Sequence, residues 1–285
     1  QYATEDGVPT EAQIREARQQ IRDVEAKYAK ELADGSWVNL TPTGKPSELT
    51  KGQWVQVRTD NFKKFFGDWE NDPANASKVV NENTGEPRVM YHGSEDAGFV
   101  EFDTSGSGKT EGTGAWFTEN NLGASTYSRT KDEARLISTN PNADYEEYSA
   151  GNYSVFLNIR DPFIADFEGK SWDMYGAEKE WYAENSDGEI IEYFTNKEDA
   201  DYFEQISDEP VTIVELDNAD LASSSDDLVR NARETGEYDG AILENIMDEG
   251  KYGAGYGWSD KSIVAFNPNQ IKSAVGNVGT FDNAN

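Results

Sequence analysis

The chain contains one histidine, His92, and no cysteine among its 285 residues. Without cysteine it has no thiolate nucleophile, no disulfide framework and no cysteine-ligated zinc or iron–sulfur site. A single histidine also excludes a histidine-rich metal site and any relay that needs two imidazoles. The 55 Asp and Glu residues form so many carboxylate pairs that no one pair indicates a glycosidase. His92 is therefore the starting point for assigning chemistry.

Two glycine-rich segments are similar to nucleotide-binding motifs but do not match them. Residues 107–110 read Ser-Gly-Lys-Thr, the end of a phosphate-binding loop, yet Asp103 stands where the first glycine is required. Residues 253–257 contain three glycines without the spacing of a dinucleotide fingerprint, and no helical pattern follows them. We interpret both segments as loops. The acid-rich stretch 217–227 lacks the calcium-loop pattern and is interpreted as a solvated face.

His92 is the first of several motifs whose order and spacing are informative. Taken alone, it reads as a satisfied histidine at the end of a strand. It stands, however, in the sequence Tyr91-His92-Gly93, and residues 114–118 read Gly-Ala-Trp-Phe-Thr about two dozen positions later. Tyr127 follows Phe117 by ten positions, and residues 262–273 read Ser-Ile-Val-Ala-Phe-Asn-Pro-Asn-Gln-Ile-Lys-Ser.

As a set, these motifs resemble the ADP-ribosyltransferase superfamily, in the His-Tyr-Glu branch shared by diphtheria toxin and the poly(ADP-ribose) polymerases. In those polymerases a Tyr/His-Gly strand end is followed by Gly-Ile-Tyr-Phe and then, ten residues later, by a second tyrosine. The chain is similar in particular to ADP-ribosyltransferase-like domains of phage and mobile-element polyproteins. The resemblance covers about residues 55–282 and is lowest in the acidic middle.

The resemblance implies that the substrate is NAD and that no metal is needed. The family reaction breaks the bond between nicotinamide and ribose through an oxocarbenium-like state and passes ADP-ribose to a nucleophile. His92 would hydrogen-bond the adenosine ribose, the backbone of Gly93 would bond the nicotinamide amide, and Trp116 and Tyr127 would enclose the nicotinamide ring. The residues expected to bind NAD are Tyr91, His92, Gly93, Trp116, Phe117 and Tyr127, and those expected to act in catalysis are His92, Trp116 and Ser262.

The sequence departs from the family signature at two of these positions. Trp116 replaces the signature tyrosine and can still stack on the nicotinamide. Ser262 falls where the polymerases carry the catalytic glutamate, and it offers a hydrogen bond but no negative charge. Family members without this glutamate typically transfer a single ADP-ribose or are inactive. The carboxylates that could substitute are those of Asp260, Glu111 and Glu119.

The resulting hypothesis is a mono-ADP-ribosyltransferase that acts on a protein, as a phage- or toxin-type effector. The alternatives are a catalytically inactive binding module of the same fold, an NAD glycohydrolase, and an unrelated acidic α+β domain. In this family the loop before the third motif recognises the target, which here corresponds to residues 250–260. That loop contains glycines together with Tyr252, Tyr256 and Trp258, so we expect it to contact the protein acceptor.

The elements that must position these residues point to an α+β domain with a largely antiparallel sheet. The resemblance implies a split antiparallel β-sandwich with peripheral helices. Residues 10–35 predict an amphipathic helix that begins with a capping box and either docks on the main domain or pairs with another chain. We expect residues 1–50 to form this helix and a linker, and residues 51–285 to form the main domain.

Further elements follow from short patterns along the main domain. Strands are predicted at 54–57, 88–91, 115–118, 153–159, 240–243 and 262–266. Helices are predicted around 121–138, 172–184, 197–206 and 223–235. An aromatic turn at 62–69 is expected to close one edge of the core.

The formal charge of -30 is distributed unevenly. Between Asp161 and Glu249 there are 27 acidic and 5 basic residues, which predicts an acidic insertion at about 161–249. Such a segment favours a basic protein partner. Nucleic acid and anionic membrane are not expected as partners, because both would be repelled. The chain begins at Gln1 without methionine or signal-peptide features, so we expect a fragment of a longer polypeptide or a processed product.

Overall fold

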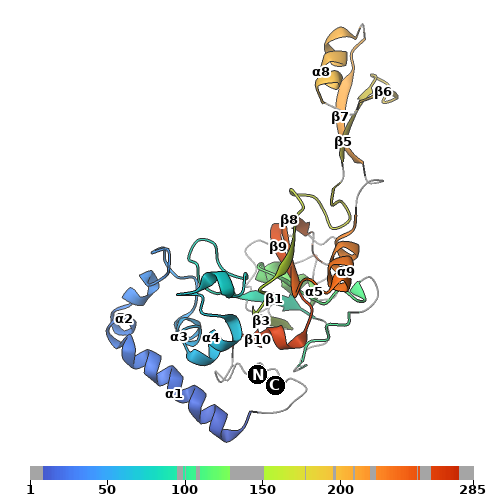
Figure 1. Ribbon diagram of the computed structural model, residues 1–285. Helices are drawn as coiled ribbons and strands as arrows, with labels where there is room; N and C mark the ends of the chain where they lie inside the picture. Colours follow the sequence, from blue (N-terminus) through green and yellow to red (C-terminus); the bar gives the residue numbers. More distant parts are fainter. Residues whose placement is uncertain are drawn as a thin grey trace.

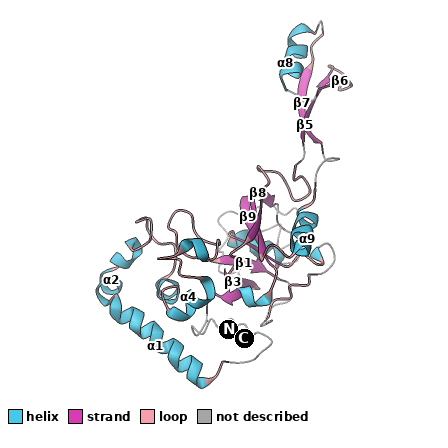
Figure 2. Cartoon of the chain, in the orientation of Figure 1, coloured by secondary structure: helices cyan, strands magenta, loops and turns pink. Residues whose placement is uncertain are grey.

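The computed structural model has the expected α+β class, with a helical N-terminal part beside a mixed sheet (Figures 1 and 2). It describes residues 9–94, 99, 101–106, 110–128, 151–176, 178–194, 197–207, 209–218, 223–248, 250 and 258–275. Residues 129–150 and 251–257 thus lie outside the described residues, and so does the part of the predicted helix 121–138 beyond residue 128.

The N-terminal helix forms as predicted, as α1 (Glu11–Lys27) followed by α2 (Ala29–Asp34). Its capping box is complete, because Thr10 Oγ1 accepts from Gln13 N while Gln13 Oε1 accepts from Thr10 N. Its apolar stripe, with Val24 and Tyr28, packs against a core that contains Trp54. The helix therefore docks on its own chain.

The strand predicted at 54–57 is wrong, because residues 54–56 belong to a helix, α3 (Lys51–Gln56), and Val57 is its C-cap. Thr50 and Gln53 form a second capping box, which starts a helix despite the two valines. Next comes α4 (Asp60–Phe66), which places the predicted aromatic turn in the core. The N-terminal core contains Leu32, Leu49, Trp54, Val55, Val57, Phe62, Phe65, Phe66, Trp69, Ala76, Phe156 and Ala274.

The main sheet has seven strands in the order β10-β3-β1-β2-β9-β8-β4, and it is antiparallel except for the parallel β4–β8 pair. The strands are β1 (Met90–Gly93), β2 (Ala115–Thr118), β3 (Asn152–Leu157), β4 (Pro162–Asp166), β8 (Gly240–Asp248), β9 (Trp258–Ala265) and β10 (Ile271–Ser273). All five strand predictions after residue 80 fall on strands of this sheet.

Residues 178–218 form a separate three-stranded sheet that stands away from the rest of the molecule, the body (Figure 1). We call these residues the arm. The arm consists of β5 (Glu178–Glu184), β6 (Ile190–Phe194), α8 (Lys197–Ile206) and β7 (Thr212–Asn218). Its two ends meet at the body, where Tyr175 and Ser223 exchange backbone hydrogen bonds of 3.2 and 2.9 Å.

The helix predicted at 172–184 is wrong, because β5 occupies its second half. β5 is the central strand of the arm and pairs with β6 on one side and β7 on the other. These long-range pairings override the local apolar spacing that suggested a helix. The helix predicted at 197–206 coincides with α8, and the one at 223–235 corresponds to α9 (Ser225–Thr235).

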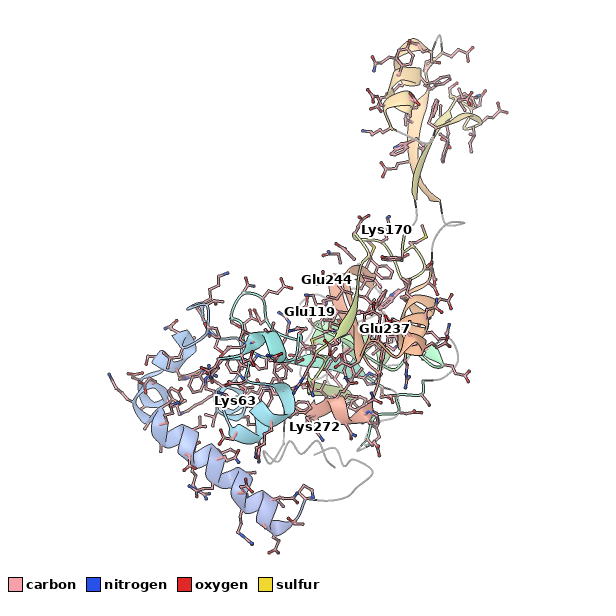
Figure 3. All side chains as sticks on the ribbon, in the orientation of Figure 1. Lys63, Glu119, Lys170, Glu237, Glu244 and Lys272 are labelled. Atoms are coloured by element: carbon pink, nitrogen blue, oxygen red, sulfur yellow. The ribbon has the colours of Figure 1, made fainter. Side chains whose placement is uncertain are left out.

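The acidic segment 161–249 divides between the arm and the body. β4, α9 and β8 belong to the body, and Lys170 lies on the part of the body nearest the arm (Figure 3). The arm alone holds 14 acidic and 2 basic residues, so it carries a large share of the charge of the whole chain. The boundary between residues 50 and 51 stays a prediction, although Leu49 shares a core with Trp54.

Candidate active site

Three neighbouring strands and one helix bring the predicted site residues together. β1, β2 and β9 are adjacent in the main sheet, and α5 (Asn121–Tyr127) packs against β1. β1 carries the Tyr-His-Gly motif, β2 the Trp-Phe pair and β9 the serine, and α5 ends at the second tyrosine. The residues are Tyr91, His92, Gly93, Trp116, Phe117, Tyr127 and Ser262.

The strand side chains divide between the two faces of the sheet, because successive residues point to opposite sides. His92 and Phe117 lie on one face, where their ring centroids are 5.6 Å apart. Trp116 lies on the other face, and so does Ser262, which pairs with Thr118 two residues further along β2. The side chains of His92 and Trp116 therefore lie on opposite faces of the sheet.

The imidazole of His92 lies among four aromatic rings. Its Nδ1 is 2.7 Å from the carbonyl oxygen of Trp116, and because a carbonyl only accepts, Nδ1 carries the proton. Burial lowers the pKa of His92, an effect that the hydrogen bond to Trp116 partly opposes, so the ring is neutral near pH 7. Nε2 is then a hydrogen-bond acceptor. The four rings, with centroids 5.2 to 6.3 Å from that of His92, belong to Phe99, Phe102, Phe117 and Tyr153.

Gly93 lies directly beneath the last turn of α5. A methyl group built on its Cα would overlap the carbonyl oxygen of Ala124 and lie 3.1 Å from Cβ of Tyr127. The glycine is therefore required by the close approach of α5, in addition to the access that the resemblance implies for nicotinamide. This packing brings Tyr127 to the end of β1.

Two contacts fix the orientation of the Trp116 indole. Its Nε1 donates to Thr113 Oγ1 at 2.9 Å, and its ring meets that of Trp172 edge-on with centroids 5.6 Å apart. Trp116 nevertheless stays partly exposed. The enclosure of a nicotinamide ring between Trp116 and Tyr127 stays a prediction.

The phenol of Tyr127 is held by a carboxylate at the end of β8. Its hydroxyl donates to Asp248 Oδ1 at 2.9 Å, and Asp248 is only 4% exposed. Burial raises the pKa of Tyr127, and the neighbouring negative charge of Asp248 raises it further. Tyr127 is therefore protonated near neutral pH, and its hydroxyl remains a donor.

Ser262 lies in a row of paired residues that crosses the sheet. It pairs with Thr118 on β2 and with Leu243 on β8, and Thr118 pairs in turn with Tyr91. Ser262 is 2% exposed, so its hydroxyl is closed to bulk water. The role expected of Ser262 at the nicotinamide end of the site stays a prediction.

The three substitute carboxylates proposed from the sequence differ in their surroundings. Glu119 forms an ion pair with Arg88 at 2.8 Å, so its carboxylate is already paired with a cation. Glu111 is exposed, and its backbone oxygen accepts from Arg230 Nε. The side chain of Asp260 lies outside the described residues. None of these facts assigns a catalytic role.

Sequence reasoning missed three residues of this site: Thr113, Trp172 and Asp248. Thr113 is close to Trp116 in the chain and could have been found from its position before β2. Trp172 and Asp248 are far from the motifs in the sequence, and only the folding of the chain brings them to the site. Nothing in the sequence distinguished Asp248 from the many other carboxylates except its place at the end of a long apolar strand.

Two predicted features fall on residues that the structure does not describe. They are the target-facing loop, of which 251–257 are outside, and the Gly/Ser loop at 107–109. Within the described part of the chain, no helix is long and apolar enough to cross a bilayer. The same residues contain no group of three or more His, Asp and Glu side chains that could hold a metal ion.

Comparison with known proteins identifies one family. The family described as ADP-Ribosyltransferase in polyvalent proteins matches residues 82–281, which is more than half of the chain. The match begins before β1 and ends after β10, so it contains every strand of the main sheet and the arm. Comparison with curated proteins gave no match, and neither did comparison with solved structures.

Proposed function

Since the chain belongs to the family of ADP-ribosyltransferases in polyvalent proteins, we propose that it is a mono-ADP-ribosyltransferase that cleaves NAD and modifies a target protein. Family membership indicates an NAD-dependent transferase. A phage- or toxin-type effector role is part of the proposal. The observation that supports it most strongly is the neutral imidazole of His92 on β1, which donates to the backbone carbonyl of Trp116 on β2 and so joins the first two motifs.

His92 has the protonation state that binding of a ribose requires. Nδ1 donates to the Trp116 carbonyl, which leaves the lone pair of Nε2 to accept a hydrogen bond from a ribose hydroxyl. The rings of Phe102 and Phe117 hold the imidazole in place. Because the ring cannot rotate freely, the acceptor is oriented before NAD arrives.

Trp116 and Tyr127 supply the aromatic surfaces for the nicotinamide end. The indole is oriented by Thr113 and Trp172, and the phenol is oriented by Asp248. Both rings retain partial exposure. A cationic nicotinamide ring gains from stacking against electron-rich aromatic faces.

In the proposed reaction, the bond between ribose C1 and the nicotinamide nitrogen breaks, and its electron pair leaves with nicotinamide. The ribose becomes an oxocarbenium-like cation. A nucleophile of the target protein attacks C1 and loses its proton to solvent or a nearby base. Ser262 carries no charge that could neutralise the cation, so the site favours a single slow transfer over chain elongation.

The proposal is tested with labelled NAD and a host lysate, with the wild-type protein and His92→Ala side by side. We expect labelled protein with the wild type and at least about tenfold less with the variant, because NAD loses an oriented hydrogen bond. Nicotinamide release without labelling would indicate an NAD glycohydrolase. Absence of both activities would contradict the proposal.

A second candidate function is a catalytically inactive module that keeps the fold for binding. One observation favours it: Ser262, at the position of the family glutamate, is buried and carries no charge. The two functions differ in a simple way, since an inert module would bind NAD without releasing nicotinamide.

We further propose that residues 250–260 contact the protein acceptor. The support is the aromatic and glycine content of this segment and its place after β8, although its last three residues, 258–260, belong to β9. Replacing Tyr252 and Tyr256 by alanine should leave nicotinamide release within about twofold of wild type and lower protein labelling about tenfold or more. Equal loss of both activities would contradict a role limited to the acceptor.

A further inference from the structure

Asp248 is a buried carboxylate that the sequence motifs do not explain. It ends β8, is 4% exposed and lies in contact with the last residue of α5. One of its oxygens, Oδ1, accepts two hydrogen bonds, at 2.9 Å from the Tyr127 hydroxyl and at 2.7 Å from Gly250 N. The carboxylate thus links a helix to the residue that opens the predicted target-facing loop.

Tyr127 is fixed at both ends of its side chain. Its Cβ lies over Gly93, which has no side chain to push α5 away, and its hydroxyl is bonded to Asp248. Behind it, Gly250 approaches Thr126 so closely that a methyl group on Gly250 would lie 2.8 Å from the threonine hydroxyl oxygen. The ring of Tyr127 therefore has one orientation, set jointly by β1 and β8.

A hydrogen bond to a carboxylate also changes the phenol itself. Donation to an anion withdraws the proton and leaves more electron density on the oxygen and the ring. An electron-rich ring attracts a cation above its face more strongly than a neutral group. The nicotinamide ring of NAD is a cation, whereas the released nicotinamide is neutral.

We propose that Asp248 is a positioning residue that, through its hydrogen bond to Tyr127, makes the nicotinamide site selective for the cationic ring of NAD over neutral nicotinamide. This inference rests on the proposed function, since it requires Tyr127 to contact the nicotinamide ring. It assigns Asp248 no contact with the reacting atoms. It predicts stronger retention of the substrate than of the leaving group, which assists turnover.

The test is calorimetric titration of the full chain with NAD and, separately, with nicotinamide. The variants are Asp248→Asn, Tyr127→Phe and the double variant. We expect Asp248→Asn to weaken NAD binding about tenfold and nicotinamide binding less than about threefold. Because the carboxylate acts through the phenol, Tyr127→Phe should match Asp248→Asn, and the double variant should match either single variant.

Asp166→Asn is the matched control. Asp166 Oδ1 accepts from a backbone N–H two residues on, that of Glu168, and from one side chain, Asn245, at 2.8 and 2.9 Å. It thus makes the same kind of contacts on the edge strand β4, and its replacement should leave both affinities unchanged. The melting temperature of each variant reports any general loss of structure.

Three outcomes would overturn the inference. In the first, Asp248→Asn weakens NAD and nicotinamide equally, which is what a merely structural role would produce. In the second, Tyr127→Phe keeps the preference for NAD, which would mean that the charge acts without the phenol. In the third, the wild type binds both ligands and Asp248→Asn binds them unchanged, which leaves the proposed function intact. If the wild type binds neither ligand, the proposed function fails as well.

Discussion

At the scale of single residues, protonation governs what the site can do. His92 is uncharged because burial among aromatic rings disfavours the imidazolium, and its one proton is committed to the Trp116 carbonyl. Tyr127 is a protonated phenol whose acceptor is a buried carboxylate. In the proposed function, His92 accepts a hydrogen bond from the ribose and Tyr127 presents an aromatic face to nicotinamide, and both side chains are oriented before the substrate binds.

The lowered pKa of His92 predicts a pH-dependent stability. Protonation is easier in the unfolded chain, where the pKa is about 6.5, than in the folded protein. The contribution of neutral His92 to the free energy of unfolding is therefore complete above that value and is lost as the pH falls below it. Urea denaturation at about pH 8 and about pH 5.5 should show a smaller pH-dependent loss for His92→Gln than for wild type. If the free energy of unfolding falls equally with pH in the two proteins, the burial of the imidazole is contradicted.

At the scale of secondary-structure elements, the site depends on how closely α5 approaches β1. The carbonyl of Ala124 and Cβ of Tyr127 occupy the space where a Gly93 side chain would lie. On its other side, the same helix turn meets Gly250 through Thr126. A small displacement of α5 would therefore move Tyr127 relative to both Gly93 and Asp248.

Gly93→Ala tests this approach directly. The added methyl group meets backbone, which cannot move aside, so the free energy of unfolding should fall by about 3 kcal/mol and NAD binding should weaken. Gly52→Ala is the control, since Gly52 lies in the helix α3 and a methyl group built on it would meet nothing outside its own helix turns within 4 Å. It should stabilise the protein by up to about 1 kcal/mol. Thermal unfolding of both variants measures these changes. Equal changes in the free energy of unfolding for Gly93→Ala and Gly52→Ala would contradict the tight packing of α5 against β1.

Elements specified by local signals were predictable from the sequence, and elements specified by distant partners were not. The capping box at Thr10 and the β-branched and aromatic run of β2 act within a few residues. β5 is a strand because β6 and β7 pair with it, and its own pattern suggested a helix. α3 is a helix because its capping box and the burial of Trp54 outweigh two valines.

The candidate site divides in the same way. The motifs identified His92, Gly93, Trp116 and Tyr127, since their order and spacing along the chain resemble a known family. The supporting residues Trp172 and Asp248 are placed by tertiary structure alone, through α5, β8 and the segment after β4. The three-dimensional structure is needed to distinguish Asp248 from the other carboxylates of the chain.

At the scale of the whole molecule, part of the negative charge lies on the arm. The arm holds 14 acidic and 2 basic residues and stands away from the body in Figure 1. Within the body, acidic side chains near the sheet are engaged by cations, as where Lys261 bonds Glu82 at 2.6 Å and Glu244 at 3.2 Å. We propose that an anionic dinucleotide approaches β1 and β2 away from the charge of the arm, and that this charge attracts a basic partner.

The central claim is that strands β1, β2 and β9 and helix α5 form a site that cleaves NAD. The most direct measurement is the initial rate of nicotinamide release from NAD by the purified chain, with His92→Ala and Asp166→Asn assayed beside it. We predict release by the wild type and by Asp166→Asn, and a rate at least about tenfold lower for His92→Ala. No release by a wild-type protein that binds NAD, or equal release by wild type and His92→Ala, would contradict the claim.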